Sequence, residues 1–193
     1  ALQAFYRWLK NESEQRTLSE WDCVEQLDTY RAQQGNYIGP SFAAIVGSRQ
    51  NGAIVHYHPT AEQCDPVAPG VLLIDSGGQY LEGTTDITRT ICIGEPTPEQ
   101  RTHYTLVLQG LIALSEAEFP RGTTGNQIEV LARHPLWKRG LNYGHGTGHG
   151  VGYLLNVHEG PQSFGRGAAA NNIALQPGML ITIEPGYYVP GSH

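Results

Sequence analysis

The sequence predicts an α+β or mixed α/β protein, and three observations support this prediction. Strand-like apolar runs alternate with helical patterns along the 193 residues, a length that allows a sizeable core. Helix starts are marked by capping signals, the clearest of which is Thr97-Pro-Glu-Gln100. Two continuous apolar runs, Val71–Asp75 and Met179–Glu184, are typical of strands buried on both faces. Both runs end in a carboxylate.

Four segments have helical periodicity. The second begins with the capping-box spacing Thr17-Leu-Ser-Glu20 and stops before Gly35, whereas the fourth begins at Thr124 and stops before Gly140. The predicted helices cover residues 1–9, 17–33, 97–118 and 124–139.

Six segments are predicted as strands. In the longest, alternation places Asp86, Thr88 and Thr90 on one face. We expect a loop at Ala168–Asn172 and a turn at Gln176–Gly178. The predicted strands are Ser41–Val46, Ala53–Tyr57, Val71–Asp75, Gln79–Leu81, Thr84–Ile93 and Met179–Glu184.

Composition excludes several classes of protein. A hydrophobic content of 39% with ten tyrosines excludes a disordered chain, and a net charge of −6 argues against nucleic acid as a partner. No apolar run approaches the roughly 20 residues of a membrane span, and no segment resembles a signal peptide. Three cysteines, an odd number, indicate thiols in a reducing compartment. We therefore expect a cytoplasmic protein with no membrane partner.

The segment 141–161 (LNYGHGTGHGVGYLLNVHEGP) is the most informative in the chain. Glycine at every second position from 144 to 152 would destabilise a helix, so we interpret His145 and His149 as lying on an extended segment. Its bare glycine face would let another backbone or a ligand approach closely. His158 follows in the same segment. A glycine-rich loop with solvated histidines is the alternative.

Three carboxylates occur at the end of, or within, strand-like runs. Asp75, Asp86 and Glu184 would each be costly to bury unless paired or bound to a cation. Each could instead cap a turn or pair with an arginine, for which Arg89 is the nearest candidate. Together with His149 they form a hard ligand set that suits Mn²⁺, Mg²⁺ or Co²⁺ better than a structural Zn²⁺. Two ions sharing bridging carboxylates would make a hydrolytic site.

These motifs resemble a known family. DSGGQYLEGTTDITRT, HGTGHGVGYLLNVHEGP and IEPGYY are similar to the catalytic domain of aminopeptidase P. Its members are Xaa-Pro aminopeptidases with the pita-bread fold, shared with methionine aminopeptidase, prolidase and creatinase. The resemblance covers nearly all of residues 1–193 and implies one catalytic domain that is incomplete at its C-terminus. It also implies that an N-terminal creatinase-like domain, the last strands and a fifth ligand, a glutamate, lie outside this chain. We therefore expect residues 1–193 alone to be inactive.

The resemblance also implies a metal-binding role for four residues. Asp75 would chelate one metal and orient the free amine of the substrate. Asp86 would bridge both metals, and His149 and Glu184 would ligate the second. Two divalent ions are implied, with Mn²⁺ as the first choice and Co²⁺ or Zn²⁺ as alternatives.

Four residues would act on the substrate. Glu184 would also shuttle the proton of the attacking water, and His158 would polarise the scissile carbonyl. His145 and His56 would line the cleft around the proline.

The implied function is a metal-dependent exopeptidase that releases the N-terminal residue from peptides with proline in second position. The attacking group would be a metal-bridging hydroxide. A prolidase-type dipeptidase is the second interpretation, and a pita-bread binding module without metals is the third. A homodimer is expected for the full-length parent.

Overall fold

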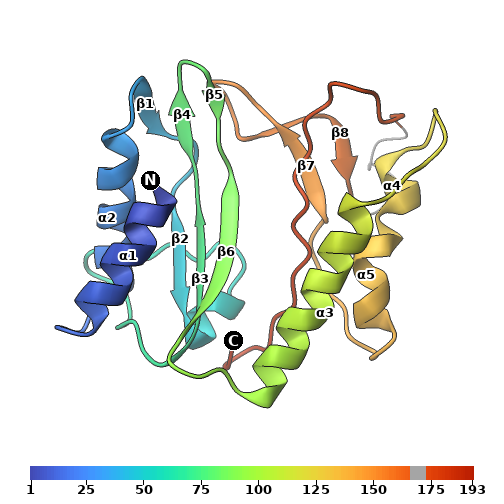
Figure 1. The fold of residues 1–193 in the computed structure, drawn as a ribbon. Helices are drawn as coiled ribbons and strands as arrows, with labels where there is room; N and C mark the ends of the chain where they lie inside the picture. The colour runs from blue at the N-terminus through green and yellow to red at the C-terminus, as the bar shows by residue number, and fades with distance from the viewer. Residues whose placement is uncertain (166–172) are drawn as a thin grey trace. The chain divides into compact units, whose positions relative to one another are not determined.

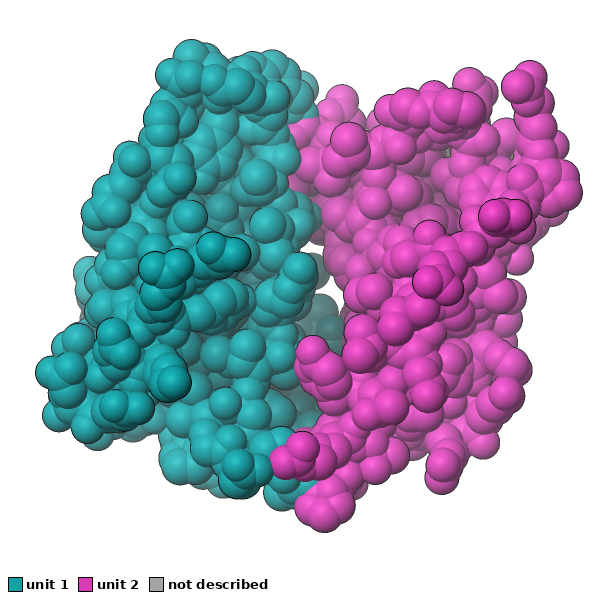
Figure 2. Space-filling model, viewed as in Figure 1, with its two compact units in different colours: residues 1–97, 153–155, 188–193 teal, residues 98–152, 156–187 magenta. Residues whose placement is uncertain are grey.

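The computed structural model describes residues 1–165 and 173–193, so the loop predicted at Ala168–Asn172 lies outside the described residues. The described chain forms two compact units, coloured separately in Figure 2, and each is described by itself. Unit 1 comprises Ala1–Thr97, Tyr153–Leu155 and Tyr188–His193, and unit 2 comprises Pro98–Gly152 and Asn156–Tyr187.

Unit 1 begins with the two predicted helices, α1 (Leu2–Ser13) and α2 (Glu20–Ala32). The capping box of α2 lies two residues later than predicted. Ser19 Oγ accepts the N–H of Asp22 (3.0 Å), and the Asp22 carboxylate accepts the N–H of Ser19 (2.7 Å). The prediction of a Thr17–Glu20 box is wrong because Glu20 is fully buried and accepts hydrogen bonds from the N–H groups of Ser48 and Asp65, which are distant in sequence.

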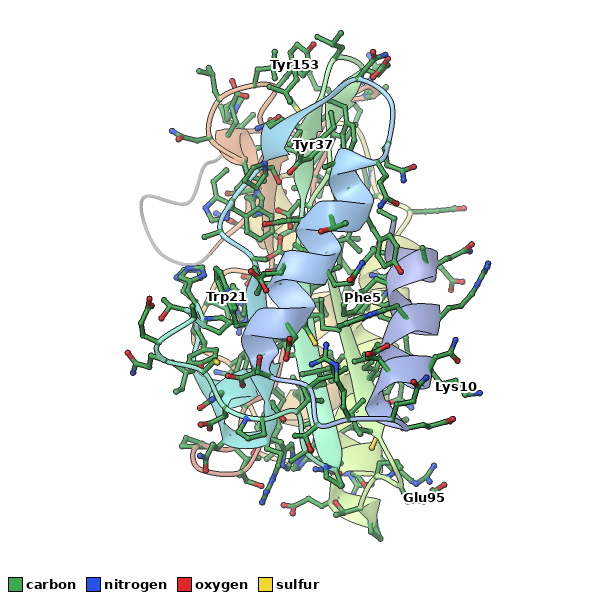
Figure 3. All side chains as sticks on the ribbon, turned by 90° about the vertical axis from the view of Figure 1, so that its left-hand side faces the viewer. Phe5, Lys10, Trp21, Tyr37, Glu95 and Tyr153 are labelled. Carbon is green, nitrogen blue, oxygen red and sulfur yellow. The ribbon has the colours of Figure 1, made fainter. Side chains whose placement is uncertain are left out.

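A three-stranded antiparallel sheet lies beside these helices, in the order β2-β3-β6. Helices α1 and α2 cover one of its faces, as Figures 1 and 3 show. The core between them includes Phe5 and Leu27 from the helices and Leu72 and Ile74 from the central strand. The strands are β2 (Ile45–Ser48), β3 (Gly70–Ser76) and β6 (Ile87–Ile93).

The central strand β3 is not buried on both faces, contrary to the prediction. Leu72, Ile74 and Ser76 are fully buried, whereas Leu73 and Asp75 on the other face are half-buried. Within unit 1 the two helices cover only one face, so an unbroken apolar run still yields an alternating pattern of burial.

The second sheet of unit 1 has the order β1-β4-β5, with β1 at Tyr37–Pro40, β4 at Gly78–Tyr80 and β5 at Gly83–Thr84. The strand predicted at Ala53–Tyr57 is absent. The chain there leaves a 3₁₀ helix, η1 (Arg49–Ala53), and turns.

Unit 2 packs helices α3 and α5 against each other, with a two-stranded antiparallel sheet of β7 and β8 (Figure 1). The helix start predicted at Thr124 is confirmed, and Thr124 and Gln127 form a capping box there. The single helix predicted after it is divided at Glu129, where Ala132 N–H bonds three residues back to the Glu129 carbonyl at 3.0 Å. The elements are α3 (Pro98–Ser115), α4 (Gly125–Ile128), α5 (Val130–Trp137), β7 (Gly148–Val151) and β8 (His158–Phe164).

The segment Met179–Glu184 runs beside β7 but is not a regular strand. The N–H groups of Thr182 and Glu184 donate to the carbonyls of His149 (2.8 Å) and Thr147 (2.6 Å). In a regular antiparallel ladder, His149 N–H would donate to a backbone carbonyl of the neighbouring segment. Here it donates to the Thr182 hydroxyl at 3.0 Å. A side chain thus replaces a backbone acceptor, and the predicted strand is not formed.

None of the helices among the described residues is both long enough and apolar enough to cross a lipid bilayer.

Candidate active site

The two candidate aspartates lie on neighbouring strands of unit 1. Asp75 in β3 faces Thr88 in β6, and Asp86 immediately precedes β6, two residues from Thr88. Side chains opposite each other, and those two residues apart, project from the same face of a sheet. Asp75 and Asp86 therefore share the face away from α1 and α2. Arg89 lies opposite Ile74, so its side chain projects from the other face of the sheet, and it donates to the Thr88 carbonyl (2.7 Å). The sheet therefore does not favour Arg89 as an ion-pair partner for these aspartates.

A buried arginine holds the backbone next to both aspartates. Arg31 of α2 is only 3% exposed. Its Nη2 donates to the carbonyl and the hydroxyl of Ser76, both at 3.0 Å, and its Nη1 donates to the Thr85 hydroxyl at 3.3 Å. Since Ser76 follows Asp75 and Thr85 precedes Asp86, this single guanidinium links the two segments that carry the candidate aspartates.

His56 belongs to unit 1 and lies on a turn. Its φ of 60° places it in the left-handed region, and its side chain is exposed. The next residue anchors the turn, because the Tyr57 hydroxyl donates to the buried Glu20 carboxylate at 2.7 Å. Burial and this bond raise the pKa of Tyr57. On the other side of the loop, Asp65 N–H donates to the same carboxylate at 2.8 Å.

The centre of the unit 2 site is a pair formed by His149 and Glu184. His149 Nε2 lies 2.9 Å from Glu184 Oε1, and His149 Nδ1 lies 2.8 Å from the Gly150 carbonyl oxygen. A carbonyl at Nδ1 favours the tautomer that leaves Nε2 as a metal ligand. Neighbouring ligands bound at about 2.1 Å to an octahedral ion are about 3.0 Å apart. The donor atoms therefore fit a shared divalent cation.

Glu184 is held in its ionised form. Burial raises its pKa, but the close contact with His149, the hydrogen bond from Thr182 and the nearby His158 outweigh burial, so the net pKa is lowered. A buried carboxylate that stays ionised at neutral pH can bind a cation or accept a proton.

The bare glycine face predicted for residues 144–152 is confirmed at three positions. A Cβ atom would come within 1.9 Å of the Thr182 oxygen at Gly148, 2.0 Å of the Glu159 oxygen at Gly150 and 2.1 Å of the Asn156 oxygen at Gly152. In each case the neighbour is backbone. The missing side chains thus let residues 179–184 and the 156–159 segment pack directly against β7.

The other two histidines of the motif lie in unit 2 as well. His158 begins β8, and its ring centroid is 4.0 Å from that of His149. His145 lies in the segment before β7, with Nδ1 2.7 Å from the Gly146 carbonyl oxygen and its ring 4.9 Å from that of Tyr143. Both rings have defined neighbours, so the alternative of a merely solvated glycine-rich loop does not describe this segment.

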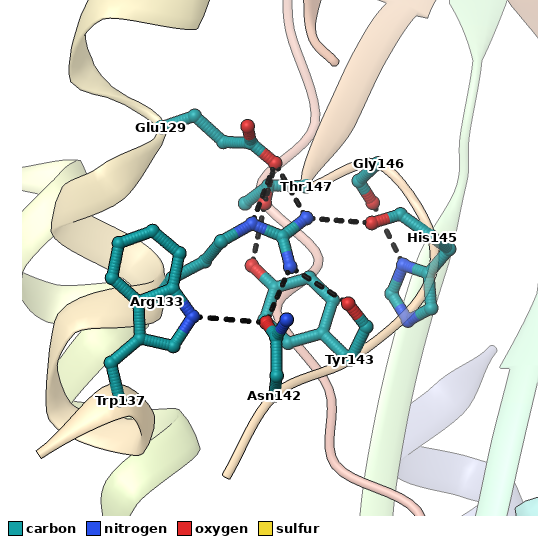
Figure 4. A network of polar contacts seen from close by, with 8 residues as sticks. All are labelled: Glu129, Arg133, Trp137, Asn142, Tyr143, His145, Gly146 and Thr147. Carbon is teal, nitrogen blue, oxygen red and sulfur yellow. Dashed lines mark hydrogen bonds and ion pairs between the residues drawn. The ribbon is translucent and has the colours of Figure 1, made fainter. Parts of the chain in front are cut away.

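A buried ion pair beside this segment was not predicted. Arg133 and Glu129 are 2% and 7% exposed, and their closest N–O distance is 2.7 Å (Figure 4). Their spacing of four is the signal that could have found them, but the same spacing is usual for ion pairs on a helix surface.

The ligand chemistry and the fold together define a class of protein. The family model of metallopeptidase family M24 matches residues 1–193, and the chain belongs to this family.

Curated relatives give a finer comparison. The probable Xaa-Pro aminopeptidase P of Tuber melanosporum is 47% identical over 194 residues, and its counterpart in Neurospora crassa is 46% identical over 196 residues. Both alignments cover 100% of this chain, but only 31% and 29% of the relatives. The chain thus spans about a third of the length of these relatives.

Solved structures have the same fold. The X-prolyl aminopeptidase of Caenorhabditis elegans, described as a cytosolic enzyme with a di-nuclear active site, is 39% identical with a TM-score of 0.94. The match covers 100% of this chain and 31% of that one. The Xaa-Pro dipeptidase of Bacillus anthracis is 30% identical with a TM-score of 0.82 over 98% of this chain and 51% of that one. The predicted pita-bread fold is confirmed.

Proposed function

We propose that this chain contributes the catalytic site of a metal-dependent Xaa-Pro aminopeptidase, which removes the N-terminal residue from peptides with proline in second position. The observation that carries the proposal is the His149–Glu184 pair, with Nε2 and Oε1 2.9 Å apart and the other ring nitrogen held by a carbonyl. Membership of the M24 metallopeptidases and the names of the relatives support it.

The site would hold two divalent cations. Asp75, Asp86, His149 and Glu184 are the residues that would hold them. When bound, the cations supply Lewis-acid activation of the attacking water and of the scissile carbonyl. Three carboxylates and one imidazole favour Mn²⁺ over Mg²⁺, with Co²⁺ or Zn²⁺ as alternatives.

The side chains of this chain supply the remaining functions. Glu184, held ionised, accepts the proton of the attacking water. His158 donates a hydrogen bond to the carbonyl oxygen as negative charge develops on it. Asp75 orients the free amine of the substrate, while His145 and His56 contact the substrate around its proline.

A prolidase-type dipeptidase is the second candidate function. It is favoured by the dipeptidase from Bacillus anthracis among the structural neighbours. The higher identity to the aminopeptidases ranks it second. A cytoplasmic location and a homodimer of the full-length protein stay predictions.

A peptide panel tests the proposal. Full-length protein loaded with Mn²⁺ would be assayed on tripeptides that differ only in Pro or Ala at the second position, on the Xaa-Pro dipeptide, and on an N-acetylated Xaa-Pro tripeptide. We expect hydrolysis of the free Xaa-Pro tripeptide alone among the tripeptides. Equal cleavage of the Ala peptide would refute the specificity, and cleavage restricted to the dipeptide would favour the prolidase function. The inactive Glu184→Gln variant excludes a contaminating peptidase.

A further inference from the structure

The buried guanidinium of Arg133 makes a hydrogen bond with every donor it has (Figure 4). Only 2% of this residue is exposed, so its charge is removed from water and depends on protein acceptors. Five N–H groups make five bonds. The acceptors are Glu129 Oε1 (3.0 and 2.7 Å), Asn142 Oδ1 (3.0 Å) and the carbonyls of Tyr143 (2.8 Å) and His145 (2.7 Å).

A second set of contacts attaches this cluster to the start of β7. Thr147, which is fully buried, donates from its hydroxyl to Glu129 Oε1 at 2.8 Å and shares a hydrogen bond with the Tyr143 hydroxyl. The Tyr143 ring also lies under the guanidinium, with its centroid 3.9 Å from Arg133 Cζ. The ion pair between Glu129, which precedes α5, and Arg133 within α5 therefore contacts the chain on both sides of His145.

The acceptors lie where regular structure does not hold the backbone. Residues 142–146 are outside the helices and strands, so no β-ladder determines the direction of their carbonyls. Arg133 binds the carbonyl of His145 itself, and the His145 ring is set against the next carbonyl, that of Gly146.

We propose that Arg133 is a positioning residue for His145. It holds the backbone of the 142–147 segment so that the His145 ring is correctly placed for the substrate, and this role involves no direct contact of Arg133 with substrate or metal. The inference rests on the proposed function, because it assigns Arg133 to the substrate side of that site. The His149–Glu184 pair depends instead on β7, on residues 182–184 and on the bond from Glu184 N–H to the Thr147 carbonyl, none of which Arg133 contacts directly.

The geometry requires arginine rather than any cation. Four acceptors in different directions are matched by the planar fork of a guanidinium, whereas an ammonium group has three donors at one point. Arg133→Lys therefore keeps a positive charge near Glu129 while losing the carbonyl contacts that set the backbone.

The test compares Arg133→Lys with Arg16→Lys in the full-length protein. Arg16 is exposed and contacts two carboxylates, Glu12 at 3.0 Å and Asp22 at 3.3 Å, so Arg16→Lys controls for the chemical change alone. We expect kcat/KM on an Xaa-Pro tripeptide to fall by about 10- to 100-fold in Arg133→Lys, through kcat more than KM, and to stay unchanged in Arg16→Lys. Bound metal per chain should equal wild type in both.

Coupling to His145 separates positioning from general destabilisation. In a His145→Ala background, Arg133→Lys should lower kcat/KM by no more than about twofold, because its target is already absent. In metal-free protein, ¹⁵N-labelled histidine NMR should show a shift of the His145 ring signals and none for His149. A loss that multiplies with His145→Ala, or a loss of metal from Arg133→Lys, would overturn the proposal.

Two further outcomes are distinguishable. If wild type hydrolyses no Xaa-Pro peptide, the proposed function fails, while the NMR shift still reports on the role of Arg133. If Arg133→Lys does not fold, Asn142→Ala at an exposed position removes one acceptor of the same guanidinium. It should shift the same His145 ring signals and lower kcat/KM less than expected for Arg133→Lys. No shift and no loss would overturn the inference.

Discussion

His158 and His149 are neighbouring histidines for which we propose different roles. The ring centroid of His158 is 4.0 Å from that of His149, yet His149 is paired with Glu184 and His158 is exposed at the start of β8. Adjacent imidazoles can thus serve different functions, one on the metal and one on the substrate.

We predict that His158→Ala lowers kcat by about 10²- to 10³-fold, since it removes a donor to the developing oxyanion. Metal content, measured by elemental analysis, should equal wild type. His149→Ala is the matched control and should lose metal. Loss of metal from His158→Ala as well would make His158 a ligand or a support for one.

At the scale of elements, the glycines of β7 determine how closely the chain carrying Glu184 approaches. Gly148 is buried and faces the Thr182 carbonyl, whereas Gly144 has open space around its missing side chain. Substitution of glycine by alanine should therefore be disruptive at position 148 and tolerated at position 144.

We predict that Gly148→Ala disrupts metal binding and Gly144→Ala does not. The new methyl group at 148 would lie 1.9 Å from the Thr182 oxygen, so residues 182–184 must move away from His149. Overpacking of this kind costs about 1–3 kcal/mol of the free energy of unfolding. Calorimetric titration with Mn²⁺ and urea unfolding would measure both effects. Equal metal affinity in the two variants would contradict this role of the glycine face.

At the scale of the whole molecule, the proposed ligand set leads to a prediction of which metal ion supports the protein. Mg²⁺ keeps several of its waters and prefers oxygen, whereas Mn²⁺ and Co²⁺ accept an imidazole beside carboxylates. An ion that binds the folded state also raises the free energy of unfolding, by about 2.7 kcal/mol at one hundred times its Kd.

We predict that metal-stripped full-length protein regains activity and thermal stability with Mn²⁺ or Co²⁺ and little of either with Mg²⁺. Activity on an Xaa-Pro tripeptide and Tm would be measured after each addition, with Ca²⁺ as a cation of equal charge for comparison. Full recovery with Mg²⁺ alone would show that His149 is not a ligand of consequence.

Some features of this protein followed from the sequence by itself because they depend on neighbours along the chain. The helix start at Thr124 was predicted correctly because its signal, Thr124 followed three residues later by Gln127, is local. Asp86 projects from the same face of the sheet as Thr88, because side chains two residues apart in extended backbone point to the same side. The site motifs could be identified for the same reason, because short motifs such as HGTGHG are contiguous in the sequence.

Other features were decided only by the tertiary structure. Glu20 was predicted to cap a helix but accepts bonds from Ser48 and Asp65, which are distant in sequence. Glu129 and Arg133 have the spacing of a surface pair, yet both are buried. Hydrophobic periodicity predicts the local secondary structure. The segments that cover a polar side chain and exclude water from it, however, come from distant parts of the chain. The cost of desolvation therefore decides which partner such a group takes, and only packing determines that cost.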